Sequence, residues 1–231
     1  MNAHALHYET ILAPLRLVGG KKPSVDDIYP RLFDAILEQR IAPASRFTEE
    51  GLAEIFGVSR SVIRRVLAKL SQQQVIILRP NQRAQVAAPH ALQTRQILEA
   101  RRMVEITLVQ LACAQAKPSQ IRQLRELINR ERDCIARGQR GAALRLSGEF
   151  HLQLAAMARN APLSQFLNSL VPLTALAIAH CPGTDHTACT WEEHTAIADA
   201  VEQHDCATAV ERMTQHLNHL QCRLIAPALD I

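Results

Sequence analysis

The chain has 231 residues, of which 48% are apolar, 21% charged and 3% aromatic, and its formal net charge is +4. This length allows two modest domains, and the composition is ordinary for a soluble globular protein. No stretch reaches the ~18 to 20 continuous apolar residues of a membrane helix, and no secretory signal pattern appears, which predicts a cytoplasmic protein without a membrane partner.

The first 24 residues show no hydrophobic period and end in a Gly-Gly-Lys-Lys-Pro run, so they are predicted to form a mobile or loosely docked arm. Apolar residues at helical spacing predict a helix from Val25 to Arg40, which Pro43 is expected to close. The expected organisation is an arm at residues 1–24, a first domain at 25–89 and a second domain at 90–231.

The stretch from Thr48 to Leu70, TEEGLAEIFGVSRSVIRRVLAKL, predicts two short helices joined by a tight turn. Gly57 is expected to end the first helix, and the hydroxyl of Ser59 is expected to cap the second. The second helix is apolar on one side and cationic on the other, a form that suits the DNA major groove. The residues predicted to face DNA on this helix are Ser59, Arg60, Ser61, Arg64 and Arg65.

Two short apolar runs follow, Val75 to Leu78 and Ala84 to Ala88, and they predict a small hairpin with Arg83 in its basic turn. Residues 58 to 83 contain six arginines or lysines and no acidic residue, which is the charge distribution that phosphate binding requires. The alternative is an ordinary helix pair with a solvated basic face. The order of three helices and a hairpin is typical of a winged helix-turn-helix.

The segment from about Val25 to Pro89 resembles the DNA-binding domain of the GntR family of bacterial transcription regulators. The matching pieces are IAPASRFTEEGLAEIFGVSR, SVIRRVLAKL and LRPNQRAQVAAP. The resemblance implies binding to double-stranded operator DNA, with the family's recognition-helix arginines at Arg60 and Arg64.

The chain departs from the family pattern at five positions. Glu50 stands where the family usually has an arginine that touches DNA, which bears on the operator that is recognised. Val62 and Ile63 replace a usual Pro-Val pair, and Arg65 replaces an acidic residue. Arg83 stands where the wing turn usually has a glycine, and we expect it to contact a phosphate or the minor groove instead.

After Pro89 the chain is predicted to be helical throughout, so the fold class is mainly α: an N-terminal winged helix-turn-helix and a C-terminal antiparallel all-α helical bundle. Pro172 is expected to kink the fourth bundle helix, and Thr190 and Asp205 are expected to cap the last two. The predicted helices are Leu92 to Ala116, Ser119 to Arg137, Ala142 to Arg159, Leu163 to His180, Trp191 to Gln203 and Cys206 to Ile225, with Gly138 and Gly141 separating the second from the third.

Three histidines, His151, His194 and His216, stand on apolar helix faces where core residues are expected. A single histidine in such a place is usually a hydrogen-bonded core residue. Three of them on three helices predict a metal site, because imidazole is a common ligand for zinc and bundles build such sites from facing helices.

Arg101 and Glu105 are a second polar pair that helical spacing places inside the bundle. One interpretation is an internal ion pair between residues four apart, of small energetic value. The other is a cavity arginine that binds a carboxylate with its planar fork, which predicts an organic-acid effector.

The bundle resembles the ligand-binding helical domain, of the FCD type, in the FadR branch of GntR regulators. The matching pieces are EARRMVE, SGEFHLQLAAMARNAPL, WEEHTAIADAVEQHD and MTQHL. The resemblance implies a divalent metal such as Zn or Ni held by His151, His194 and His216. The family's fourth ligand, an aspartate, falls on Ser147, so the site is expected to be weaker, to take water or an effector carboxylate there, or to be empty.

These expectations favour a metabolite-responsive transcription regulator, a repressor, that binds DNA as a homodimer because a two-fold protein matches a palindromic operator. One alternative is a regulator for which the metal itself is the signal. Another is a metal-dependent hydrolase, against which Glu149 and Glu193 are expected to point away from the histidine face and so provide no base. A metal clip formed by Cys181, His186 and Cys189 is a further, minor alternative.

Overall fold

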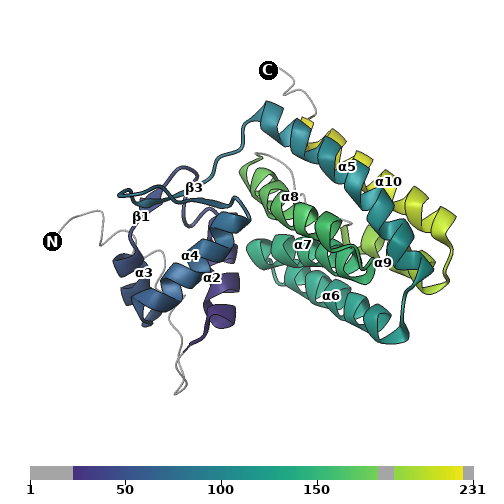
Figure 1. The fold of residues 1–231 in the computed structure, drawn as a ribbon, viewed down its shortest axis with the longest axis horizontal. Helices are drawn as coiled ribbons and strands as arrows, with labels where there is room; N and C mark the ends of the chain where they lie inside the picture. Colours follow the sequence, from purple (N-terminus) through teal and green to yellow (C-terminus); the bar gives the residue numbers. More distant parts are fainter. Residues whose placement is uncertain (1–22, 182–189, 226–231) are drawn as a thin grey trace. The chain divides into compact units, whose positions relative to one another are not determined.

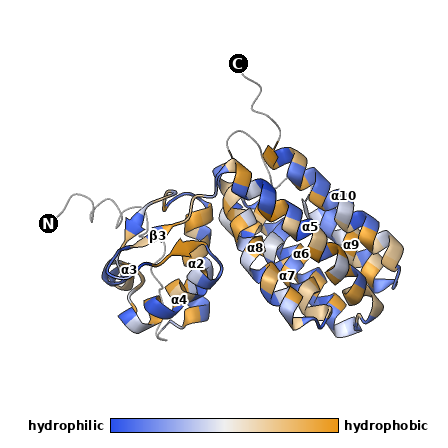
Figure 2. Cartoon of the chain, turned by 45° about the horizontal axis from the view of Figure 1, so that its top comes forward, coloured by the Kyte–Doolittle hydropathy of each residue, from blue (hydrophilic) through white to orange (hydrophobic). Residues whose placement is uncertain are grey.

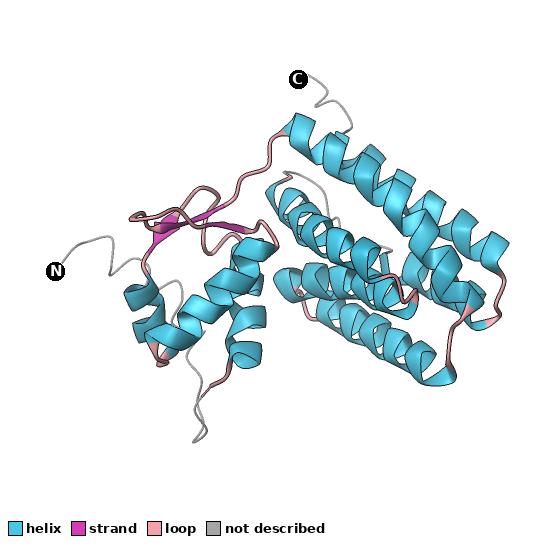
Figure 3. Ribbon diagram, viewed as in Figure 1, coloured by secondary structure: helices cyan, strands magenta, loops and turns pink. Residues whose placement is uncertain are grey.

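The computed structural model describes residues 23–181 and 190–225, and the chain divides into two compact units, Met1–Ala88 and Pro89–Ile231 (Figure 1). Within the described ranges, every strand belongs to the first unit, and the second unit is built from helices (Figure 3). The fold class predicted from the sequence is therefore confirmed. The expected arm, except for its last two residues, and the clip residues His186 and Cys189 lie outside the described residues.

From residue 23 onward, the first unit contains three helices and a three-stranded antiparallel sheet in the order β1-β3-β2. The register pairs Phe47 with Ala84 and Ile77 with Gln85. The elements are α2 (Val25–Leu37), β1 (Arg46–Phe47), α3 (Glu49–Phe56), α4 (Arg60–Gln72), β2 (Ile76–Ile77) and β3 (Ala84–Val86). The sequence predicts the hairpin of β2 and β3 but not β1.

Helix α3 ends as the sequence predicts, whereas the start of α4 differs from the prediction. The hydroxyl of Thr48 accepts a hydrogen bond from the Gly51 amide at 3.1 Å, and Gly57 ends α3 with a left-handed φ of 65°. Ser59 is the residue before α4, but its hydroxyl lies 2.8 Å from the Ser61 hydroxyl and makes no cap bond. The predicted Ser59 cap is therefore wrong.

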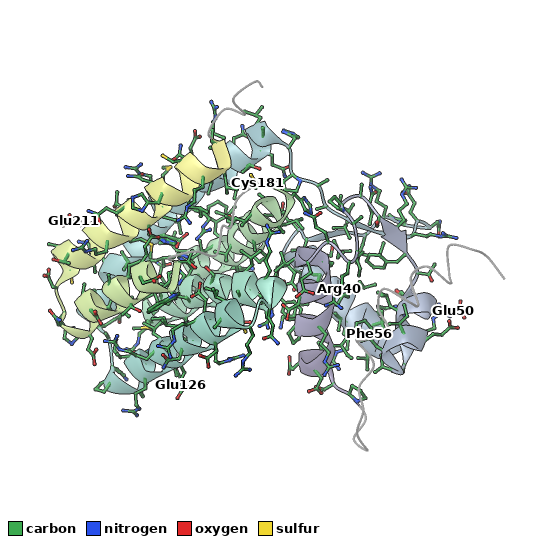
Figure 4. All side chains as sticks on the ribbon, turned by 180° about the vertical axis from the view of Figure 1, so that it is seen from behind. Arg40, Glu50, Phe56, Glu126, Cys181 and Glu211 are labelled. Carbon is green, nitrogen blue, oxygen red and sulfur yellow. The ribbon has the colours of Figure 1, made fainter. Side chains whose placement is uncertain are left out.

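Helix α2 is shorter than expected. It ends at Leu37, and Gln39 just beyond it adopts a positive φ of 56°, so the chain has left the helix well before Pro43. The apolar side of the three helices forms the core of this unit: Ile28, Leu32, Phe56, Ile63 and Leu67 are at most 2% exposed. In Figure 4, Phe56 lies among these helices, whereas the exposed Glu50 lies at the edge of the unit. Burial of one face of α4 leaves its cationic face in solvent.

The described residues of the second unit form six helices: α5 (Ala91–Ala114), α6 (Pro118–Ala136), α7 (Arg140–Met157), α8 (Ala161–His180), α9 (Thr190–Glu202) and α10 (Cys206–Ile225). The described connections between helices are three residues long, as antiparallel neighbours require. Helices α5 and α10 run side by side along one edge (Figure 1). Hydrophobic and hydrophilic residues alternate along these helices, as expected for packed amphipathic helices (Figure 2).

Several helix boundaries differ from the predicted ones. Gly141 lies inside α7, because a glycine in a first turn costs little when packing holds the helix. Thr190 is the first residue of α9, and its hydroxyl donates a hydrogen bond to Glu131 at 3.0 Å. Helix α8 continues through Pro172, and the kink predicted there stays a prediction. The prediction for Asp205 is confirmed, since its side chain accepts a hydrogen bond from the Thr208 amide at 3.0 Å.

Helix α8 is long and apolar enough to cross a membrane by length and composition, and it is the one such helix in the described residues. Half of its most apolar window is buried inside the bundle. We therefore describe α8 as a core helix of the bundle, in which an all-round apolar surface is expected.

Candidate functional site

The first candidate site is the solvent-facing side of α4 together with the wing turn between β2 and β3. Ile63, Val66, Leu67 and Leu70 are buried beneath this surface, so the residues between them point outward. The residues predicted to face DNA, Ser59, Arg60, Ser61, Arg64, Arg65 and Arg83, are all exposed.

Arg64 is held by a partner that the sequence reasoning missed. Its Nε donates to Glu49 Oε1 at 3.2 Å and its Nη2 to Glu49 Oε2 at 3.0 Å, so the pair has two contact points. The hydrogen bond from Arg64 lowers the pKa of Glu49 below its usual value, outweighing partial burial. The signal lay in Glu49 itself, an acid at the start of α3, although only the packing of α3 on α4 shows which arginine it meets.

A surface hollow lies between α3, α4 and the wing, and its lining includes Glu50, Arg60 and Arg83. The wing turn is compatible with arginine at position 83 because its left-handed residue is Asn81, with φ 56°. Asparagine is one of the side chains that tolerates this conformation best. The missing glycine therefore needs no compensation in the backbone.

The second candidate site is a histidine cluster inside the bundle. His151 of α7, His194 of α9 and His216 of α10 are each at most 3% exposed. One ring nitrogen of each lies within 4.8 Å of those of the other two, and His151 Nε2 lies 3.2 Å from His216 Nε2. The tertiary fold thus brings together three residues that are up to 65 positions apart.

Each histidine of this cluster has a carboxylate beside its Nδ1 atom. The Nδ1 atom of His194 hydrogen-bonds to Glu131 Oε2 at 2.8 Å, and that of His216 to Glu193 Oε2 at 2.6 Å. Glu105 Oε2 lies 2.5 Å from the Nδ1 atom of His151.

These contacts leave the Nε2 atoms for the centre of the cluster. The Nε2 atom of His194 is fully buried and has no hydrogen-bond partner. An orphaned buried polar atom is costly, so a bound ion or water is expected to satisfy this nitrogen. The donor set, three imidazoles with carboxylates behind them, fits a divalent metal such as zinc.

Burial governs the protonation of the cluster. It lowers the pKa of His151 to about 3, against the opposing effect of Glu105, and it also lowers the pKa of His216. Both rings are therefore neutral near pH 7, the form that binds metal. Burial raises the pKa of Glu193, but hydrogen bonds from His216 and His219 outweigh it and bring that pKa down to about 2.

A cavity adjoins the cluster, and its lining includes Arg101, Ser147, His151, His216 and Arg223. Ser147 therefore lies beside two of the histidines, where the resemblance places an aspartate. The Nε atom of Arg101 donates to Glu105 Oε1 at 2.6 Å, while its Nη2 atom is buried without a hydrogen-bond partner. Arg101 therefore forms the internal ion pair with Glu105 and also lines the cavity.

Two expectations concern acidic residues. The expected contact of Glu105 with an effector stays a prediction; its oxygens face Arg101 and His151, and it is not among the residues that line the cavity. Glu193 was expected to point away from the histidines, but it reaches across to His216 on the neighbouring helix. Spacing along one helix could not reveal this contact, because Glu193 faces away from His194 and toward α10.

The sequence matches two protein families along most of its length. Residues 24–86 match the family described as bacterial regulatory proteins, gntR family, and residues 96–219 match the FCD domain. The HTH-type transcriptional repressor RspR of Escherichia coli is 27% identical over 203 residues, which cover 86% of this chain and 88% of that protein. The Uxu operon regulator of Haemophilus influenzae is 23% identical over 194 residues, covering 77% and 72%.

Solved structures show the same fold. McbR/YncC of Escherichia coli has a TM-score of 0.69 at 16% identity and covers 98% of this chain and 99% of its own. A putative GntR transcriptional regulator from Rhodococcus sp. RHA1 has a TM-score of 0.69 at 18% identity, with coverage of 88% and 98%. At these identities the likeness concerns the fold alone.

Proposed function

The chain belongs to the GntR family of bacterial regulatory proteins and carries an FCD domain, and we propose that this transcription regulator is a metabolite-responsive repressor. Proteins of this family regulate transcription and are not enzymes, which leaves no place for the hydrolase alternative. In the proposal, the first unit binds operator DNA in the cytoplasm. The second unit binds a small organic acid next to a divalent metal, and the effector releases the DNA.

The proposed DNA surface consists of Arg60, Arg64 and Arg65 on α4 with Arg83 on the wing. Four exposed arginines on one helix face and its neighbouring turn supply the positive charge that phosphates attract. A recognition helix of this size fits the major groove, and a dimer would place two such helices on the halves of a palindrome. Repression is favoured by the likeness to RspR, whose name describes it as a repressor.

The observation that carries the effector proposal is the buried, unpartnered Nη2 atom of Arg101 in a cavity that also meets His151 and His216. A carboxylate oxygen would accept a hydrogen bond from this nitrogen. A divalent cation held by the three histidines would supply a Lewis acid for a second oxygen of the same ligand. Ser147 keeps that side of the cavity free of a competing carboxylate.

Effector binding regulates only if it differs in strength between the DNA-competent and DNA-incompetent states. The test begins with selection of genomic fragments by the purified protein, followed by anisotropy titration of one selected duplex. A panel of mono-, di- and tricarboxylates is then added with zinc present and with zinc removed by a chelator. The proposal expects at least one carboxylate to weaken operator binding, and Arg101→Gln to abolish that response while leaving basal DNA affinity intact.

A second candidate is a direct metal sensor. It is favoured by the carboxylates beside the histidines, because the protein alone supplies these groups and no organic ligand is needed to arrange them. In that case zinc or nickel alone would change operator affinity, and no carboxylate would be needed. The same titration separates the two candidates. Indifference of the operator complex to every metal and every carboxylate would count against both.

A further inference from the structure

The cluster has a second layer whose role the proposed function leaves open. We infer that Glu105, Glu131 and Glu193 act together as positioning residues that give this three-histidine centre its affinity for a divalent cation in the absence of an acidic ligand. This inference rests on the proposed function, since it concerns the same metal site. The three glutamates lie on three helices, α5, α6 and α9.

A glutamate carboxylate lies at Nδ1 of each histidine; it is hydrogen-bonded at His194 and His216, whereas at His151 it is a close ion-pair contact without hydrogen-bond alignment. A carboxylate oxygen stands 2.5 Å from Nδ1 of His151, 2.8 Å from Nδ1 of His194 and 2.6 Å from Nδ1 of His216. A carboxylate at Nδ1 fixes the hydrogen there and turns the Nε2 lone pair toward the opposite side of the ring. All three rings are thereby prepared to donate Nε2 to a shared centre.

The charges of this layer also match a divalent cation. Ser147 contributes no charge at the position of the usual aspartate, so three neutral imidazoles alone would leave a doubly charged ion unneutralised in a buried place. Arg101 offsets one of the three carboxylates through its ion pair with Glu105. A divalent cation would offset the charge of Glu131 and the part of the Glu193 charge that Arg223, 3.8 Å away, does not offset.

Glu131 has the clearest role of the three. It is 1% exposed, it holds His194 through Oε2, and its Oε1 accepts from the Thr190 hydroxyl, which carries no charge. Glu105 shares its charge with Arg101. Glu193 is partly exposed and shares its oxygens with His219 and with Arg223, whose Nη2 lies 3.8 Å away. Removing the Glu131 charge should therefore affect the cation most directly.

A buried ion pair can also exist for stability alone, with no metal involved. The two roles make different predictions for an isosteric change. Glutamine keeps an oxygen that can accept from Nδ1, so the ring orientation survives, while the charge is lost. A purely structural pair would then show a change in stability and no change in cation affinity.

The chain offers a matched control in Glu149. This acid is on α7, two residues from His151, and it pairs with Arg145 at 2.7 Å. It is half-buried like Glu193 but touches no histidine of the cluster in the described contacts. Glu149→Gln therefore removes the same charge from the same neighbourhood without altering any Nδ1 partner.

The experiment measures zinc and cobalt binding to chelator-stripped full-length protein by competition with a chromophoric chelator. We expect Glu131→Gln to weaken zinc binding by about 10- to 100-fold, as loss of such partners does at other histidine sites. Glu193→Gln, at a less buried position, should weaken it in the same direction, and Glu149→Gln should leave it within about twofold. Cobalt spectra of the variants should still report nitrogen ligands.

If Glu131→Gln does not fold, as judged by circular dichroism, Glu193→Gln carries the test because its side chain reaches solvent. Wild-type affinity in both Glu131→Gln and Glu193→Gln would overturn the inference and leave the proposed function standing. Failure of the wild-type protein to bind either cation would overturn the metal part of the proposed function and this inference with it.

Discussion

Arg64 of α4 and Glu49 of α3 form an ion pair with two hydrogen bonds, from Nε to Oε1 at 3.2 Å and from Nη2 to Oε2 at 3.0 Å. The Arg64 side chain is nevertheless 67% exposed, so one edge of its guanidinium is held and the other faces solvent. A planar fork with one edge fixed is prepared for a guanine edge or a phosphate. We therefore expect the pair to act in DNA recognition more than in stability, since exposed ion pairs contribute little.

We expect Arg64→Ala to weaken operator binding by about 1 to 3 kcal/mol if this side chain reads a guanine edge. Arg60→Ala should also weaken binding, since both charges lie on the exposed face of α4. Gel-shift titrations on the selected operator and on a scrambled duplex measure both effects. Unchanged affinity in both alanine variants would show that this face of α4 does not bind DNA.

Glu49→Gln should reduce discrimination between operator and scrambled DNA, because the guanidinium of Arg64 loses its charged anchor. The expected loss is about fivefold, equivalent to the ~1 kcal/mol upper range of an exposed ion pair. Binding to scrambled DNA should not weaken, since an acidic charge is removed near phosphates. Glu54→Gln, on the exposed side of the same helix, is the control; an equal loss in both variants would refute an orienting role for Glu49.

Arg83→Gly should weaken operator binding and flatten its dependence on salt. Each phosphate contact that is lost reduces the slope of log affinity against log salt by about one unit. The wing backbone should be unaffected, because the left-handed residue of the turn is Asn81. Affinities at four salt concentrations measure the slope, and an unaltered slope would place Arg83 away from the phosphates.

Replacing Ser147 by Asp should tighten zinc binding and weaken the effector that uses the vacant side of the cavity. The added carboxylate would face the same cavity as His151, which lies one helical turn away. Metal and effector affinity should depend on each other in the wild-type protein, because binding linkage is reciprocal. Calorimetric titrations of wild type, Ser147→Asp and His194→Ala test this; identical zinc affinity in the first two would exclude Ser147 from the site.

The stripped protein should lose stability as the pH falls below about 6.5. The pKa of His151 is lowered to about 3 and that of His216 is lowered as well, so below 6.5 the unfolded chain binds protons that the folded chain does not. Stability therefore rises with pH in this window, by at most about 1.4 kcal/mol per pH unit for each histidine. Urea unfolding at pH 7.5, 6.5 and 5.5 measures the slope, which His151→Gln should reduce; a flat profile would mean that the buried rings are protonated.

Much of the architecture could be predicted from the sequence because local rules determine it. Apolar spacing predicted the helices of both units. Gly57 predicted the end of α3 because glycine adopts the left-handed conformation of that position without strain. The charge run from residue 58 to residue 83 identified the exposed basic surface, because burying apolar residues at helical spacing leaves the intervening ones in solvent. The three histidines were identified because they interrupt apolar faces.

The partners of those residues depended on the tertiary structure. Glu49 meets Arg64 across two helices, and Glu131 meets His194 although the two residues are 63 positions apart. No spacing along a single helix encodes such a contact, since it depends on the rotation and axial position of each helix in its packing. Glu193 shows this most directly: its own helix turns it away from His194, and only the placement of α10 brings His216 to its carboxylate.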